Sequence, residues 1–234
     1  MTMRSVAPNS EAAQDPLSPH TEPFVERRRS EFSSDAADPG VSGGTQLATV
    51  QNRPPRAAVW VGKFRDADLA AVRIASRSAK SPVGRLCAVN ITKLGNGWLY
   101  PILAGLIFTR WGSWGYHIVA LAAINAALMH SLYPLIKRRV QRMRPFEVDR
   151  RLPSLLATLD EHSFPSGHTM TLTGVFVPIV LLWPAATIMA IVMACCLAWS
   201  RVATAHHYPS DVLAGFLLGA GVSYPISACL ISFW

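Results

Sequence analysis

Five apolar stretches follow one another between residue 94 and residue 234 of this chain, separated by short polar connections. Two of them have the length of about 20 residues that a helix needs to cross a lipid bilayer, and the other three need flanking residues to complete a crossing. A buried soluble core explains one such stretch but not five. We therefore predict an all-α, polytopic membrane bundle of about five crossings, possibly six. The stretches are 94–109, 116–136, 169–183, 185–199 and 212–234.

The tryptophans support a membrane location. All seven lie near the edges of the apolar stretches or in the connections between them, as in the aromatic belts of membrane proteins. Gly215 and Gly219 form a pair of small residues four apart, which indicates either close helix packing or scattered glycines. The tryptophans are Trp60, Trp98, Trp111, Trp114, Trp183, Trp199 and Trp234.

The chain before the apolar stretches has a different composition. Residues 1–56 are rich in proline, serine, alanine and acidic residues, and we predict a disordered tail without a secretory signal. Residues 57–92 mix apolar and basic residues, which favours an amphipathic helix along the membrane interface over a solvated helix. The predicted domains are therefore the tail, 1–56, and a membrane-embedded domain, 57–234, in which 57–92 is interfacial.

The chain is basic, with a formal net charge of +8. Lysine and arginine are concentrated between residues 53 and 151, which suggests an anionic membrane surface or phosphate as partner and not nucleic acid. The four cysteines show no metal-ligand spacing and are interpreted as small buried apolar residues, so we expect no metal and no cofactor. They are Cys87, Cys195, Cys196 and Cys229.

If all five stretches cross the bilayer, the N-terminal region shares one face with the loops 137–168 and 199–211. The connections on the other face carry only Arg110. The positive-inside rule then assigns the basic face to the cytoplasm. We expect an integral protein of a bacterial inner membrane.

Three polar motifs fall on that basic face. The first is Lys137, six residues, then Arg144-Pro145; the second is Pro165-Ser166-Gly167-His168; the third is Ser200-Arg201, five residues, His207, three residues, Asp211. Cations at the ends of apolar helices need an anionic partner, and nearby carboxylates are few, so an external phosphate is the natural one. Ser166 and Gly167 begin a predicted helix, where free N–H groups favour phosphate, and Gly167 permits close approach.

The two histidines of the motifs have the residue types that phosphoryl transfer needs. Asp211 lies four residues after His207, with Pro209 as the predicted first helical residue, so its carboxylate can orient the imidazole. A neutral, oriented imidazole is a nucleophile at phosphorus, and His168 can donate a proton to the leaving oxygen. The residues thus indicate two-step transfer through a phosphohistidine. Three cations and helix amides supply the charge stabilisation that metals supply elsewhere.

The three motifs together resemble the type 2 phosphatidic acid phosphatase family, lipid phosphatases that share an active-site plan with vanadium haloperoxidases. The likeness covers residues 137–221 firmly and residues from 94 onward in outline. It implies that Lys137, Arg144, Ser166, Gly167 and Arg201 bind phosphate. It also implies that His168 is the acid, His207 the nucleophile and Asp211 its partner. Many members have six crossings with the site facing outward, which leaves the leaflet open here.

The predicted function is hydrolysis of a lipid phosphate monoester or diphosphate by an integral-membrane, metal-independent phosphatase. Candidate substrates are phosphatidate, phosphatidylglycerophosphate, polyprenyl phosphate or diphosphate, and phosphorylated glycolipids. The alternatives are a non-catalytic protein that binds lipid phosphate and a vanadate-dependent haloperoxidase, against which the membrane-embedded chain argues. The expected partners are the substrate and the bilayer, and the sequence carries no signal for an oligomeric state.

Several other polar residues have plainer interpretations. Arg142 is a topology determinant or a headgroup contact, and Asp160 and Glu161 are solvated loop charges. The spacing to Arg201 and Asp211 selects His207 over the adjacent histidine, His206.

Overall fold

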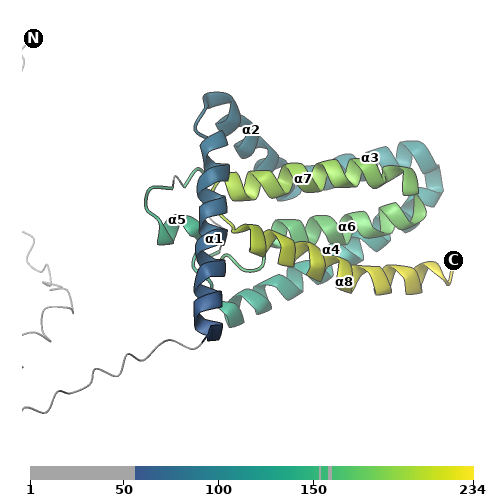
Figure 1. The fold of residues 1–234 in the computed structure, drawn as a ribbon. Coiled ribbons are helices and arrows are strands. Elements are labelled where there is room, and N and C mark those ends of the chain that lie inside the picture. Colours follow the sequence, from purple (N-terminus) through teal and green to yellow (C-terminus); the bar gives the residue numbers. More distant parts are fainter. Residues whose placement is uncertain (1–55, 153, 158–159) are drawn as a thin grey trace, which may run out of the picture. The chain divides into compact units, whose positions relative to one another are not determined.

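The computed structural model describes residues 56–152, 154–157 and 160–234. The predicted disordered tail, apart from Arg56, lies outside the described residues. The described residues form helices and no strand, which confirms the predicted all-α class (Figure 1). The helices are α1 (Arg56–Ser78), α2 (Pro82–Lys93), α3 (Leu99–Trp111), α4 (Gly115–Val140), α5 (Pro145–Val148), α6 (Gly167–Leu182), α7 (Thr187–Ala203) and α8 (Pro209–Ile231).

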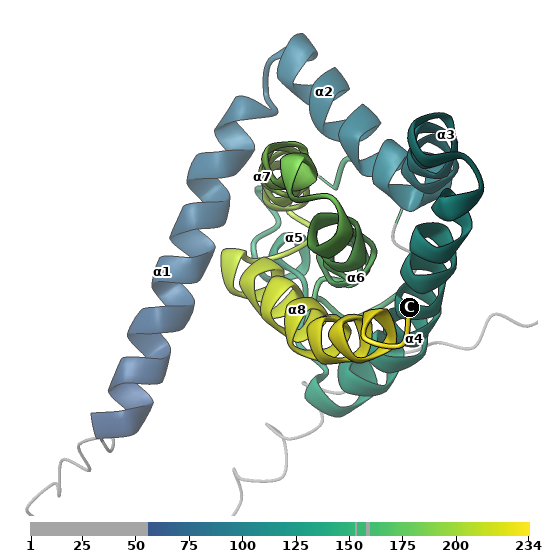
Figure 2. The same ribbon diagram turned by 90° about the vertical axis from the view of Figure 1, so that its right-hand side faces the viewer.

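The five apolar stretches correspond to α3, α4, α6, α7 and α8, which run lengthwise beside one another (Figures 1 and 2). The central helix is α6, which packs against α4, α7 and α8. Its apolar residues are buried on more than one side, as expected for a helix that is hydrophobic all round. The loops at either end of α6 therefore lie close to several other helices, and its first turn lies among their polar ends.

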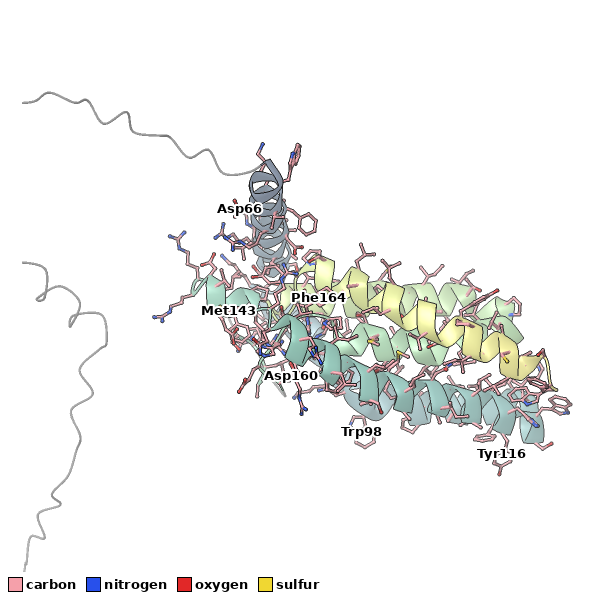
Figure 3. The ribbon with its side chains drawn as sticks, turned by 90° about the horizontal axis from the view of Figure 1, so that it is seen from below. Asp66, Trp98, Tyr116, Met143, Asp160 and Phe164 are labelled. Atoms are coloured by element: carbon pink, nitrogen blue, oxygen red, sulfur yellow. The ribbon has the colours of Figure 1, made fainter. Side chains whose placement is uncertain are left out.

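The outer surface of the bundle is apolar. Three helical segments are long and apolar enough to cross a membrane by length and composition, namely Pro82–Val148, Pro184–Ala203 and Pro209–Ile231, and α6 is a shorter apolar helix. Exposed leucine and isoleucine side chains cover their outward faces, a pattern that water disfavours and lipid favours. Figure 3 shows Asp160 and Phe164 at one end of the bundle and Tyr116 at the other. We conclude that this is an integral membrane protein.

The predicted interfacial segment 57–92 forms two helices instead of one. The break lies at Ser81, whose Oγ accepts a hydrogen bond from Gly84 N (3.0 Å), and Pro82 takes the first position of α2. Helix α1 runs crosswise to the other long helices (Figures 1 and 2). Its Val72 is buried against the bundle, whereas Trp60 is exposed. The location of α1 at the membrane interface stays a prediction.

The prediction that the cysteines are buried is wrong for three of the four. Helices of a membrane bundle are apolar on their lipid-facing sides too, so an apolar neighbourhood in the sequence does not distinguish core from surface. The exposed residues are Cys87, Cys195 and Cys229, and Cys196 is half-buried.

Gly215 and Gly219 lie where α8 crosses the start of α6. A Cβ added at Gly215 would clash with Thr169 Oγ1 and would lie 2.7 Å from the carbonyl oxygen of Ser166. A Cβ at Gly219 would lie 2.7 Å from the carbonyl oxygen of Met170. Of the two interpretations of this pair, close helix packing is therefore the correct one. The contact holds the first turn of α6 against α8.

Candidate active site

The three polar motifs meet at one end of the bundle, where they line a cavity of about 420 Å³. They come from the end of α4, the start of α6, and the connection between α7 and α8, with further walls from α2 and from η1 (Leu94–Trp98). Six of the eight predicted site residues line the cavity: Lys137, Arg144, Gly167, His168, Arg201 and His207. The other two, Ser166 and Asp211, lie buried behind them.

Ser166 and Gly167 begin α6 as predicted, with Ser166 as the N-cap. The backbone N–H of Ser166 donates to the carbonyl oxygen of Asp211 (3.1 Å), so it is already used, and its buried Oγ has no partner among the described residues. A Cβ at Gly167 would lie 3.3 Å from the ring of Tyr133, so this glycine makes room for an aromatic ring of α4. The positive end of the α6 dipole points toward the cavity.

All three predicted cations are buried, at 4% exposure for Lys137, 2% for Arg144 and 5% for Arg201. Lys137 Nζ donates to Asp160 Oδ1 (2.8 Å), and Arg144 Nη2 donates to the same oxygen (2.6 Å). The guanidinium of Arg201 forms no hydrogen bond or ion pair with any residue that the structure describes, although burying a guanidinium without an anion is costly. Arg201 is therefore the cation most available to an external anion.

The interpretation of Asp160 as a solvated loop charge is wrong. Its carboxylate forms ion pairs with both Lys137 and Arg144, so the group of predicted phosphate-binding cations already includes a carboxylate of the chain. Burial by itself raises the pKa of Asp160, but hydrogen bonds and charges from Lys137 and Arg144 outweigh burial and bring the pKa below its usual value. Asp160 is thus ionised near neutral pH.

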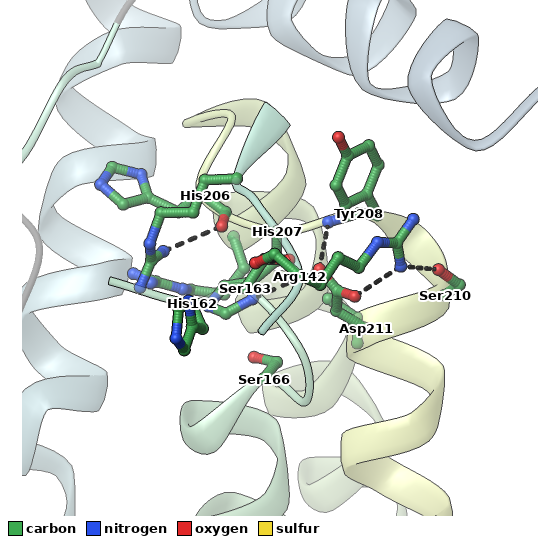
Figure 4. Close-up of polar contacts among 12 residues, drawn as sticks. Arg142, His162, Ser163, Ser166, His206, His207, Tyr208, Ser210 and Asp211 are labelled. Carbon is green, nitrogen blue, oxygen red and sulfur yellow. Dashed lines mark hydrogen bonds and ion pairs between the residues drawn. The ribbon is translucent and has the colours of Figure 1, made fainter. Parts of the chain in front are cut away.

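His207 is buried beside Asp211 (Figure 4). Its Nδ1 lies 3.7 Å from Asp211 Oδ2, within ion-pair range but longer than a hydrogen bond. Burial, and then the charges of Arg201, Arg144 and Lys137, hold the pKa of His207 well below its usual value. The imidazole is therefore neutral near pH 7 and has a free electron pair for nucleophilic attack.

Asp211 is held by a residue that the motifs do not include. Its Oδ1 accepts a hydrogen bond from Arg142 Nη1 (2.6 Å), and its Oδ2 accepts one from the backbone N–H of Tyr208 (2.9 Å). Figure 4 shows Arg142 between Asp211 and Ser210. The guanidinium of Arg142 therefore faces protein partners and not a headgroup, whereas its role as a topology determinant stays a prediction.

Three other histidines line the cavity, His130, His168 and His206, and the last two have different environments. His168 lies in the first turn of α6, and its Nε2 pairs with Oδ1 of Asn96 in η1. The ring nitrogens of His206 face the carbonyl oxygens of Thr204 (2.9 Å) and Leu156 (3.1 Å). His206 is therefore held by backbone, which agrees with the choice of His207 from its spacing.

Sequence reasoning missed several residues of the site. Asp68 and Asn96 lie far along the chain from the motifs, and no spacing points to them. Tyr133 lies only four residues before Lys137, but its place in an apolar helix gives no sign of a role in the site. The charges of Arg142 and Asp160 are visible in the sequence, but their ion-pair partners are not. No group of three or more His, Cys, Asp or Glu side chains that could hold a metal ion occurs within 56–152, 154–157 and 160–234.

Comparisons with known proteins agree with this arrangement. The model of the PAP2 superfamily matches residues 114–232. A lipid A 1-phosphatase of Rhizobium johnstonii is 38% identical over 93 residues, which cover 38% of each chain. A decaprenylphosphoryl-5-phosphoribose phosphatase of Mycobacterium tuberculosis is 35% identical over 141 residues, which cover 54% of this chain and 67% of the relative.

A solved structure is also similar. The crystal structure of a transmembrane PAP2 type phosphatidylglycerolphosphate phosphatase from Bacillus subtilis aligns with a TM-score of 0.59 and 26% identity. The alignment covers 75% of this chain and 90% of that one. The helical arrangement described above is therefore shared across most of both chains.

Proposed function

The chain belongs to the PAP2 superfamily, and on that premise we propose that it is a membrane phosphatase that releases inorganic phosphate from a lipid phosphate monoester or diphosphate. One observation carries the proposal. Three buried cations, Lys137, Arg144 and Arg201, and two histidines, His168 and His207, line a single cavity at the polar end of an apolar bundle. A phosphate headgroup reaches that end of the bundle while its lipid chain stays beside the apolar helices.

The cations bind the phosphate of the substrate. The guanidinium of Arg201 has no partner among the described residues. Lys137 and Arg144 each have a donor that is hydrogen-bonded to Asp160 in this structure and that a phosphate would accept from instead. The first-turn amides of α6 add partial positive charge, and the buried Oγ of Ser166, which forms no cap hydrogen bond, is a further donor for the phosphate. Together these groups neutralise the charge on the phosphoryl oxygens as the lipid oxygen leaves.

The histidines carry the chemistry. Asp211 faces Nδ1 of His207, so Nε2 is the atom that bonds to phosphorus as the bond between phosphorus and the lipid oxygen breaks. His168 donates a proton to that oxygen. In the second step His168 removes a proton from water, the water oxygen bonds to phosphorus, and the bond to His207 breaks. Orthophosphate and the free lipid alcohol, or the lipid monophosphate in the case of a diphosphate, are the products.

The scheme uses no metal ion, because cations and amides of the chain supply the positive charge. The substrate class that we propose includes phosphatidate, phosphatidylglycerophosphate, polyprenyl phosphates and phosphorylated glycolipids. The names of the relatives are consistent with this range. The positive-inside rule supports a cytoplasmic active site in a bacterial inner membrane, with the α1–α2 segment along the same interface.

The test is phosphate release by detergent-purified protein with EDTA present. The panel contains phosphatidate, phosphatidylglycerophosphate, undecaprenyl diphosphate and lipid A, with His207→Ala as the paired variant. We expect release by the wild type and none by the variant. Binding of these lipids without release would instead support a non-catalytic lipid-phosphate-binding protein, and a requirement for added magnesium would contradict the scheme.

A further inference from the structure

Two residues outside the three motifs connect α1 to Asp211. Arg142 Nη1 donates to Asp211 Oδ1 (2.6 Å), and Arg142 Nη2 donates to Asp68 Oδ2 of α1 (2.7 Å). Ser210 completes the network, since its Oγ accepts from Arg142 Nη1 (2.7 Å) and its backbone N–H donates to Asp68 Oδ1 (3.2 Å). One guanidinium therefore joins a carboxylate of α1 to the carboxylate beside His207.

The network is shielded from water. The Asp211 side chain is 0% exposed and the Asp68 side chain 4%, while the Arg142 side chain is 23% exposed. The Arg142 guanidinium also stacks on the Tyr208 ring at 3.8 Å. Two buried carboxylates share this single cation, so each carboxylate depends on it, and the geometry of the three groups is tightly coupled.

The two oxygens of the Asp211 carboxylate have different partners. Arg142 donates to Oδ1, whereas Oδ2 accepts from the backbone N–H of Tyr208 and also faces Nδ1 of His207 at 3.7 Å. Without Arg142, the carboxylate could rotate toward other donors and no longer face the imidazole. Asp68 acts one step further away, because it holds both Arg142 and the backbone of Ser210 at the start of α8.

We propose that Asp68 and Arg142 are positioning residues, which hold the Asp211 carboxylate toward His207 and make the packing of α1 on the bundle a condition for turnover. This inference rests on the proposed function, since it assigns His207 a reaction. It adds that α1, which lies outside the part of the chain matched to the family, contributes to catalysis through a chain of three charged groups.

The chain offers a matched control. Arg73 of α1 forms a second ion pair, through its Nε, with Asp149 Oδ2 (2.7 Å). This pair also links α1 to the segment that follows α4, but it contacts neither Asp211 nor His207. Asp149→Asn therefore removes an ion pair of α1 without touching the proposed positioning network.

The kinetic experiment measures kcat, KM and inhibition by orthophosphate for Asp68→Asn, Arg142→Gln, Asp211→Asn and Asp149→Asn. We expect Asp68→Asn and Arg142→Gln to lower kcat by about 10- to 100-fold, with little change in KM or in the orthophosphate inhibition constant, because the phosphate-binding cations are untouched. Arg142→Gln combined with Asp211→Asn should lose little more than Asp211→Asn alone. Asp149→Asn should keep wild-type kcat, and Arg142→Lys should recover part of the loss.

Three results would overturn the proposal. One is an equal loss of kcat in Asp149→Asn, which would show that α1 acts only through its overall packing. Another is a multiplicative loss in the double variant, and the third is wild-type kcat in Asp68→Asn. If Arg142→Gln does not fold, the kcat values of Asp68→Asn and Arg142→Lys test the positioning role instead.

A second readout separates this proposal from the proposed function. Nitrogen NMR of histidine-labelled protein in detergent reports which ring nitrogen of His207 carries the proton, whether or not the protein is active. We expect the Nδ1–H tautomer in the wild type and in Asp149→Asn, and a mixture of tautomers in Arg142→Gln. A silent lipid panel with this tautomer shift would refute the phosphatase alone, and an active wild type without the shift would refute the positioning role alone.

Discussion

Asp160 is expected to compete with phosphate for the cations of the cavity. Its Oδ1 accepts hydrogen bonds from Lys137 Nζ at 2.8 Å and from Arg144 Nη2 at 2.6 Å. These are donors that a bound phosphate would use. The substitution Asp160→Asn keeps the size of the side chain but removes its charge, so the two cations become available to an external anion.

The magnitude follows from the contacts. A hydrogen bond to a charged group contributes about 1.5–3 kcal/mol net. The Asp160 side chain is 37% exposed, so solvent screens it, and the amide of asparagine still accepts a weaker bond. We therefore take the low end for one such bond, about 1.5 kcal/mol, which corresponds to slightly more than about a tenfold change in an equilibrium constant.

The assay is binding of orthophosphate to purified protein by calorimetry, together with its inhibition constant against the best lipid substrate. We expect both constants, and KM, to fall about tenfold in Asp160→Asn. Glu161→Gln is the control, because Glu161 is the adjacent exposed carboxylate and forms no ion pair with any residue that the structure describes. Unchanged or weaker orthophosphate binding in Asp160→Asn would refute the reasoning and show that Asp160 orders the cations instead of competing for them.

Three further predictions concern other parts of the site. His207→Ala should lower turnover by at least about 10³-fold and Asp211→Asn should lower it less, both with wild-type melting temperatures and with EDTA present. Burial, and then the charge of a neighbouring arginine, lower the pKa of His206 from 6.5 to about 4 despite its two carbonyl contacts. The folded state thus disfavours the proton, so about 3 kcal/mol of stability present above pH 6.5 should be lost as the pH falls to 4, and His206→Gln should reduce the fall in melting temperature over that range without abolishing it, because His207 contributes a loss of the same sign. Gly215→Ala should lower both melting temperature and kcat because its Cβ would clash with α6, whereas Gly221→Ala, which meets nothing within 4 Å, should change neither; equal effects of the two would contradict the close-packing interpretation.

The sequence predicted the helices and motifs well because these depend on local patterns. An apolar stretch of sufficient length predicts a spanning helix from its own residues alone. The short offset from His207 to Asp211 keeps the two side chains close, because His207 lies just before the N-cap of α8 and Asp211 lies in its first turn. The partners of charged residues were not predictable in this way. Asp160 and Glu161 are neighbours with the same charge, yet only Asp160 faces Lys137, and that depends on how the loop before α6 folds.

The role of Arg142 was missed for a related reason. It follows Arg138 and Arg139 in a basic run, and a basic run at the end of a spanning helix already has an explanation in membrane topology. What distinguishes Arg142 is a carboxylate 74 residues earlier in the chain, at Asp68. No spacing rule relates a residue of α1 to a residue in the connection between α4 and α5, so only the folded structure identifies this pair.

The close contact between α6 and α8 restricts which residues near the cavity tolerate substitution. Backbone atoms and glycines hold Ser166, Gly167 and His168 in place, so few substitutions there preserve the spacing. Further walls of the cavity come from η1 and from the loop that carries Leu156 and Asp160, which lie outside the contact between α6 and α8. On the proposed function, replacing wall residues would change the headgroup preference while the proposed reacting groups keep their places.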